Sequence, residues 1–290
     1  MKRAFAALAL LTIPAWIASA QFGGLGGLGR IKDKIDSTTS KTKPVTDRAQ
    51  RAVENYAAWT PEEEQQIGEA TAAKMIAMFG VVDAPKLVQY VNLVGQAVAQ
   101  FAPRQIPYRF GVLDSDIVGA FAMPGGFIFI TKTALEGMTS EAQLAGALGH
   151  EIVHVSERHL ETEIRGKKNS AWAMEEAKAK VTQGPDVLRN RVDAFMKDYF
   201  TTRLSRDKED GADERGTLMA VQAGYAANGL MDFLRALAEA QSKPENQRAF
   251  GQLLSTHPPF NERIAHLEPI VQRNGPTGKT LEARFTASLK

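Results

Sequence analysis

The chain has 290 residues, of which 44% are hydrophobic and 23% are charged, the proportions of an ordinary globular protein with one or two domains. Its 35 basic and 33 acidic side chains leave a net charge of +2 with no long basic run, so nothing indicates a nucleic-acid partner. Because the sequence contains no cysteine, disulfide bonds, thiol catalysis and a lipid-modified cysteine are excluded.

The first twenty residues have the pattern of an export signal. A basic start, Lys2-Arg3, precedes an apolar stretch that ends at Ile17, and Ala18-Ser19-Ala20 supplies the small residues that a signal peptidase requires. We therefore expect cleavage after Ala20 and a periplasmic location. An uncleaved anchor is disfavoured, because about fourteen apolar residues that include Pro14 are short for a span of roughly twenty. No later stretch is apolar enough to cross a bilayer, so the mature chain is not expected to be integral to the membrane.

The remaining sequence divides into three segments. Residues 21–55 begin with GGLGGLG and are predicted to be a flexible lead-in. Residues 56–272 carry the periodic patterns and are predicted to form one domain, and residues 273–290 are expected to be a C-terminal tail. The domain begins with a helix that Thr60 caps and Gly80 ends, and a second helix starts near Pro85.

A strand pattern follows at residues 108–113, and a second strand, residues 127–131, comes after a Pro-Gly-Gly turn. An exposed edge of such a pair can bind an extended peptide as an additional strand. A plain hairpin that packs on the next helix is the alternative, and the pattern does not decide between them. Under the first interpretation, the substrate-binding residues are Gly125, Gly126, Phe127 and Ile128.

Ser140–His159 is predicted to be a single amphipathic helix, since its apolar residues recur at spacings of three and four. Ser140 and Gln143 form a capping box at its start. Arg158 and His159 at its end are interpreted as cations that interact with the helix dipole and the last carbonyl groups.

This helix carries the motif His-Glu-x-x-His. His150 and His154 are four residues apart, so their side chains lie on one face with Cβ atoms about 5–6 Å apart. Two helical histidines in this arrangement bind zinc, and the intervening Glu151 acts as general base.

Beyond the motif the sequence is mainly helical. Glu161–Asp186 is charged and is interpreted either as a flap over the site or as a surface excursion. Val187–Arg215 is predicted to be one long helix, and further helices are expected at 230–241, 245–254 and near 261–267.

Catalytic zinc generally has three protein ligands, so one more must come from elsewhere in the chain. Glu209 is the best candidate, because a glutamate on a separate helix can approach the metal from the side. Asp213, one turn later, could accept the free N–H of a zinc histidine. The alternative for this acidic run is a solvated helix face, and the run taken alone favours that alternative.

Several motifs occur together in a fixed order. After Pro124-Gly125-Gly126 come His150-Glu151-x-x-His154-x-x-x-Arg158-His159, Ser205-Arg206-x-x-Glu209-x-x-Ala212-Asp213, Ala223-Gly224-Tyr225, and Thr256-His257-Pro258 with Arg263. This set, from about Thr60 to Leu267, resembles the zinc metallopeptidase family of the CAAX prenyl endopeptidase, HtpX, BepA and LoiP, the forty-eighth metallopeptidase family. Because the sequence ends before the tetratricopeptide repeats of BepA would begin, we expect the greatest similarity to short periplasmic LoiP-like members.

The resemblance implies an α+β, mostly helical, zincin-like fold with a small β-sheet beside the HExxH helix. It implies one Zn²⁺ per chain, bound by His150, His154 and Glu209, with Glu151 as general base and acid. It also places His257 near the metal, where it can cap the open coordination position.

Two further points concern the substrate. His257 or Arg263 could donate to the oxyanion that forms during peptide hydrolysis. Many family members have an Asn-Ala pair before the Pro-Gly-Gly turn, whereas this chain has Gly119-Ala120, so a substrate-orienting amide is missing.

The sequence thus predicts a periplasmic zinc endopeptidase that hydrolyses unfolded or misassembled envelope proteins. The alternative is a chaperone or assembly factor for outer-membrane proteins whose zinc site is latched and weakly active. The expected partners are extended polypeptides and outer-membrane proteins or their assembly machinery.

Overall fold

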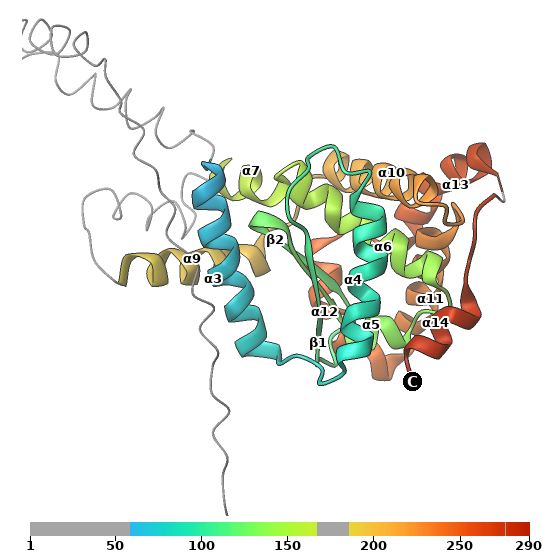
Figure 1. Cartoon of the computed structure of the whole chain (residues 1–290), viewed down its shortest axis with the longest axis horizontal. Helices are drawn as coiled ribbons and strands as arrows, with labels where there is room; N and C mark the ends of the chain where they lie inside the picture. Colours follow the sequence, from blue (N-terminus) through green and yellow to red (C-terminus); the bar gives the residue numbers. More distant parts are fainter. Residues whose placement is uncertain (1–58, 167–185, 276) are drawn as a thin grey trace, which may run out of the picture. The chain divides into compact units, whose positions relative to one another are not determined.

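The computed structural model describes residues 59–166 and 186–290, with the exception of residue 276 (Figure 1). The predicted signal peptide, the predicted lead-in and most of the predicted flap lie outside the described residues. Within the described part of the chain, no helix has both the length and the apolar character needed to span a membrane.

The described residues form many helices and one small sheet, which confirms the predicted fold class. In chain order the elements are α3 (Pro61–Phe79), α4 (Pro85–Ala99), β1 (Arg109–Leu113), β2 (Ala120–Met123), η1 (Pro124–Gly126), β3 (Phe127–Thr131), α5 (Lys132–Glu136), α6 (Glu141–Ser156), α7 (His159–Gly166), α9 (Asp186–Thr201), α10 (Arg206–Gln222), α11 (Gly229–Gln241), η2 (Pro244–Asn246), α12 (Gln247–Thr256), α13 (Phe260–Asn274) and α14 (Glu282–Ser288).

The sheet has three strands in the order β1-β3-β2. β1 is parallel to β3, and β2 is antiparallel to β3 and forms a hairpin with it around η1. The turn requires glycine, because Gly125 and Gly126 have φ values of 71° and 93°. Since β3 is hydrogen-bonded on both sides, the edges of this sheet belong to β1 and β2.

The start and end of α3 are as predicted. The Thr60 hydroxyl accepts from the backbone N–H of Glu63 at 3.2 Å, and the Glu63 carboxylate accepts from the N–H of Thr60 at 2.9 Å. Gly80, with φ of 74°, follows the last residue of the helix. This capping box fixes the direction of α3, which packs against η1 and α9.

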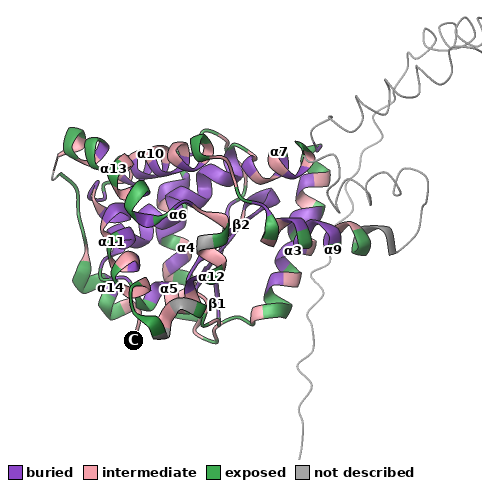
Figure 2. Cartoon of the chain, turned by 180° about the vertical axis from the view of Figure 1, so that it is seen from behind, coloured by how far each residue is buried: buried purple, intermediate pink, exposed green. Residues whose placement is uncertain are grey.

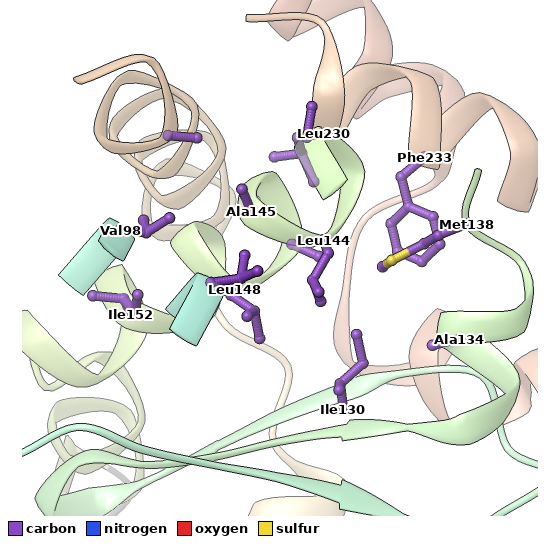
Figure 3. Packing of buried hydrophobic residues seen from close by; sticks show 14 of the residues in the cluster. Val98, Ile130, Ala134, Met138, Leu144, Ala145, Leu148, Ile152, Leu230 and Phe233 are labelled. Atoms are coloured by element: carbon purple, nitrogen blue, oxygen red, sulfur yellow. The ribbon is translucent and has the colours of Figure 1, made fainter. Parts of the chain in front are cut away.

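Helix α6 lies at the centre of the molecule, and all of its residues are buried (Figure 2). It packs on α4, α10, α11 and the sheet. Leu144 points toward Ile130 of β3, and Ile152 lies beside Val98 of α4 (Figure 3). An amphipathic surface helix would bury only one face, so the apolar periodicity understates how completely α6 is enclosed.

Helices α6 and α10 touch through their backbones. A Cβ atom on Gly149 would lie 2.6 Å from the carbonyl oxygen of Gly216, and one on Gly216 would lie 2.5 Å from the backbone nitrogen of His150. Only glycine permits this approach, which sets α10 directly against the HExxH motif.

Two helix predictions are wrong in their extent. The helix predicted over Ser140–His159 ends at Ser156, because Arg158 takes a left-handed conformation with φ of 53° and α7 begins at His159. At its start the Ser140 hydroxyl accepts from the N–H of Gln143 as predicted, but the Gln143 amide oxygen accepts from Thr139 instead of Ser140.

The long helix predicted over Val187–Arg215 is divided into α9 and α10 by residues 202–205. The reason is tertiary, because α9 packs on α3 and α12 whereas α10 packs on α6, and one straight helix could not reach both sets of neighbours. The segment predicted to be a tail includes α14, whose Phe285 is buried in the core.

Candidate metal centre

Four side chains from three helices converge at one point. His150 and His154 come from α6, Glu209 from the first turn of α10, and His257 from the C-cap of α12. Their potential ligand atoms all lie within 4.8 Å of one another, and no other cluster of this kind occurs among the described residues. The structure therefore brings the three predicted metal ligands together and adds His257 to them.

The geometry of this cluster fits a cation. The Nε2 atoms of His150 and His154 face each other at 2.9 Å, and the Glu209 carboxylate lies 3.6 Å from Nε2 of His154 and 3.9 Å from Nε2 of His150. Glu209 is fully buried, and its Oε1 atom has no hydrogen-bond partner. A buried carboxylate oxygen without a donor is costly, and a metal ion between these groups would satisfy it.

The charges of the donors agree with this interpretation. Burial lowers the pKa of His154 well below its usual value, so the imidazole is neutral and has a lone pair. Burial alone would raise the pKa of Glu209, but the charge and hydrogen bond of His257 outweigh it and hold this pKa far below its usual value. Two imidazole nitrogens and one carboxylate, with no sulfur, form a donor set that zinc accepts.

Glu151 is buried beside the cluster but is not part of it. Burial raises the pKa of its carboxyl group, although the nearby His150 and His257 oppose the effect. A carboxyl group with a raised pKa can take up a proton near neutral pH and release it again, as a general base and acid must do.

Asp213 and Arg263 lie behind His150, on the side away from the cluster. Oδ1 of Asp213 is 2.8 Å from Nδ1 of His150, the contact expected from the sequence. Arg263 donates to both oxygens of Asp213, through Nη2 at 2.6 Å and Nε at 2.9 Å. These donors of Arg263 are therefore engaged by Asp213, whereas the sequence offers Arg263, as an alternative to His257, as a donor to the oxyanion of the substrate.

A pocket opens beside Glu151 and His154. One wall is the edge of the sheet, residues 118–122, which includes Gly119, and the opposite walls come from α9 and α12. Tyr199 of α9 lines this pocket, hydrogen-bonds to the backbone of Ala122 and has a pKa well above its usual value, because it is buried and lies near the charge of Glu151. No pattern in the sequence distinguished Tyr199 from other helical aromatic residues.

The four residues predicted to bind substrate lie elsewhere. Gly125 and Gly126 are buried in the η1 turn, Phe127 lies under the guanidinium of Arg109, and Ile128 belongs to the core on the central strand. The structure does not bring them to the cluster, and the sheet edge at the pocket is β2. The reason is the strand order, which places β3 between two partners.

Arg158 and His159 have tertiary partners, so their interpretation as helix-end cations is wrong. Arg158 donates from Nη2 to Glu64 of α3 at 2.6 Å and from Nη1 to the carbonyl of Trp59 at 3.1 Å. Nδ1 of His159 lies 2.9 Å from Nδ1 of His154. The sequence does not predict a structural role for Glu64, because its partners Arg104 and Arg158 are 40 and 94 residues away and no short pattern around Glu64 indicates them.

Comparisons with known proteins agree with the motifs. Residues 85–271 match peptidase family M48. The chain is 25% identical over 215 residues to the beta-barrel assembly-enhancing protease of Escherichia coli K12, an alignment that covers 70% of the chain and 42% of that relative. It is 24% identical over 161 residues to metalloprotease YcaL of Escherichia coli K12, covering 56% of the chain and 61% of YcaL. It is 30% identical over 158 residues to the mitochondrial metalloendopeptidase OMA1 of Arabidopsis thaliana, covering 54% of the chain and 30% of OMA1.

The alignment thus spans less than half the length of the assembly-enhancing protease. The family match, in contrast, covers more than half of the chain and includes every residue of the cluster as well as Glu151. The chain therefore belongs to peptidase family M48.

Proposed function

We propose that this protein is a periplasmic zinc endopeptidase that hydrolyses peptide bonds of unfolded or misassembled envelope proteins. The observation that carries the proposal is the buried cluster of His150, His154 and Glu209 with the carboxyl group of Glu151 beside it. The export pattern of the first twenty residues and the similarity to the beta-barrel assembly-enhancing protease support a role in the envelope.

In this proposal His150, His154 and Glu209 hold one zinc ion per chain. When bound, zinc polarises the scissile carbonyl and lowers the pKa of water at the site, which makes a nucleophile available near neutral pH. Asp213 accepts the Nδ1–H of His150, which leaves Nε2 with its lone pair toward the ion.

Glu151 transfers the protons. It takes the proton of the attacking water and returns it to the nitrogen of the leaving amine, so it has to be near the ion without binding it. The raised pKa of Glu151, which burial causes, suits both steps.

The edge of β2 is the surface that we assign to the substrate. Residues 119–122 line the pocket beside Glu151, and an extended peptide can add to this edge as a further strand. The predicted residues Gly125–Ile128 contribute indirectly, because they form the turn and the central strand that hold β2 in place. Because Gly119 has no side-chain amide to orient the substrate, the peptide would be aligned by hydrogen bonds to the backbone of the β2 edge.

Metal analysis and a cleavage assay test the proposal directly. We expect about one zinc per chain, and cleavage of an unfolded protein such as casein that stops when a chelator removes the metal and resumes when zinc is restored. A Glu209→Gln variant should have lost both zinc and cleavage. A wild-type protein that contains no zinc, or that cleaves equally well in excess chelator, would contradict the proposal.

A second candidate function, a chaperone or assembly factor with a latched site, is favoured by His257. Its Nδ1 atom lies 2.7 Å from Oε2 of Glu209, and it completes the cluster of four potential ligands. Burial lowers the pKa of His257 but the carboxylate of Glu209 more than compensates, so this pKa is raised. From this position His257 would compete with a water or a substrate carbonyl for a bound ion.

We expect His257→Ala to raise the rate of casein cleavage roughly tenfold, because removal of the competing side chain makes the open state the main one. The matched control is His266→Ala on α13, whose imidazole contacts the backbone of Asp210 outside the cluster and should leave the rate unchanged. A fall in cleavage at unchanged zinc content would instead assign His257 as a donor to the oxyanion. Stoichiometric zinc without cleavage in either protein would favour the chaperone.

A further inference from the structure

The two helical histidines of the cluster are each contacted from behind, but by different partners. Nδ1 of His150 faces the carboxylate of Asp213. Nδ1 of His154 instead faces another imidazole, that of His159, at 2.9 Å, and the two rings are inclined at 70°. Both imidazoles are buried.

The distance between these nitrogens determines where the protons are. A nitrogen pair at 2.9 Å is a hydrogen bond only if one atom donates and the other accepts. Because Nε2 of His154 needs its lone pair for a metal ion, the proton of this neutral ring is on Nδ1, which donates. Nδ1 of His159 is then the acceptor, and the proton of His159 is on Nε2.

The next contact in the chain fits this assignment. Nε2 of His159 lies 3.1 Å from Oε2 of Glu157. An ionised carboxylate accepts hydrogen bonds and cannot donate them, so Nε2 of His159 is the donor here. Glu157 in turn accepts from Nη2 of Arg215 at 2.8 Å. The contacts from His154 through His159 and Glu157 therefore end on an arginine, as the contacts from His150 through Asp213 end on Arg263.

The break between α6 and α7 makes the imidazole pair possible. Residues five apart on a continuous helix are separated by about 500° of rotation, that is about 140°, and point in different directions. The left-handed conformation of Arg158 reverses the chain so that His159 turns back onto His154. Such a conformation is costly for a residue other than glycine, and the bonds of Arg158 to Glu64 and to Trp59 hold it.

We propose that His159 is a positioning residue that fixes the tautomer and ring orientation of His154 for metal binding. The inference rests on the proposed function, since it requires that His154 is a ligand. It assigns to an imidazole the role that a carboxylate or a backbone carbonyl usually has behind a metal histidine.

Two variants of the full chain separate this role from simple packing. His159→Phe keeps a ring of similar shape but has no acceptor, and it should weaken zinc binding 10–100-fold in competition with a chelator. His159→Asn places an amide oxygen near the position of Nδ1 and should recover most of the affinity. His266→Phe is the matched control and should bind zinc like the wild type.

Nitrogen-15 NMR of the wild-type imidazole groups gives a readout that does not depend on any variant. The chain has five histidines, which makes assignment practical. With zinc bound, we expect a protonated Nδ1 on His154 and a protonated Nε2 on His159. Wild-type affinity in His159→Phe, equal loss in the Phe and Asn variants, or a proton on Nδ1 of His159 would each overturn the inference. A wild-type protein that binds no zinc would instead contradict the proposed function.

Discussion

Glu151→Gln is expected to lower the rate of casein cleavage by about 10²–10⁴-fold while the zinc content stays near one per chain. The substitution keeps the size of the side chain and a hydrogen-bonding oxygen, but an amide cannot take up the proton of water. Glu151 is outside the cluster of potential ligands, so its replacement should not release the metal. Purified wild type and variant would be compared for zinc content and for initial rate at equal concentration.

Glu157→Gln provides a matched control, because Glu157 is also a glutamate of this region but contacts His159 and Arg215 instead of the pocket. Its rate should fall far less than that of Glu151→Gln. If Glu151→Gln, loaded with zinc and free of contaminating protease, cleaves casein at the wild-type rate, Glu151 is not the general base.

Glu64→Leu is expected to lower the free energy of unfolding by about 3 kcal/mol. Glu64 is buried on α3 and accepts from Arg104 at 2.6 and 2.7 Å, from Arg158 at 2.6 Å and from the backbone of Gly125 at 3.2 Å. Removing the carboxylate leaves two guanidinium groups without their common partner. Because both are about a quarter exposed and regain some water, the loss should lie at the lower end of the range for buried pairs. Urea unfolding measures it.

Glu69→Leu is the control for this substitution, since Glu69 is an exposed glutamate on the same helix and its replacement should change the free energy of unfolding by less than about 0.5 kcal/mol.

The difference in the free energy of unfolding between wild type and Glu64→Leu should also depend on pH. Burial raises the pKa of Glu64, but Arg104 and Arg158 lower it by a larger amount. The pKa in the folded protein is therefore below the ordinary value of 4.5. The stabilisation is therefore fully present above pH 4.5 and is lost as the pH falls through the folded pKa. A difference that stays constant at lower pH would contradict this account.

The sequence was most informative where the pattern is local. The helical spacing of His150 and His154 and the Ser140 cap lie within one element, and the structure shows both. The position of Glu209 was not determined by periodicity, because an acidic run on a helix equally suits a solvated face. It was the order of several motifs that indicated Glu209, and packing of α10 on α6 puts it beside the histidines.

The features that escaped prediction depend on contacts between distant segments. The division of the long helix between α9 and α10, the turn at Arg158 and the position of β2 at the pocket edge follow from neighbours that no short window of sequence contains. Arg158 illustrates the reason. Its left-handed backbone conformation is unfavourable on its own and persists because Glu64, 94 residues earlier in the chain, binds its guanidinium.

The backbone contact between Gly149 and Gly216 bears on how the centre tolerates sequence change. Side chains in a core can adjust their rotamers when a neighbour is replaced, whereas two helix backbones in contact have nothing left to rearrange. The distance between the helices that supply His150 and Glu209 therefore does not depend on the surrounding apolar side chains. Those side chains can be substituted during evolution without moving the two helices apart. The same contact concentrates the vulnerability at two positions, since even a methyl group on either glycine would force the two halves of the centre apart.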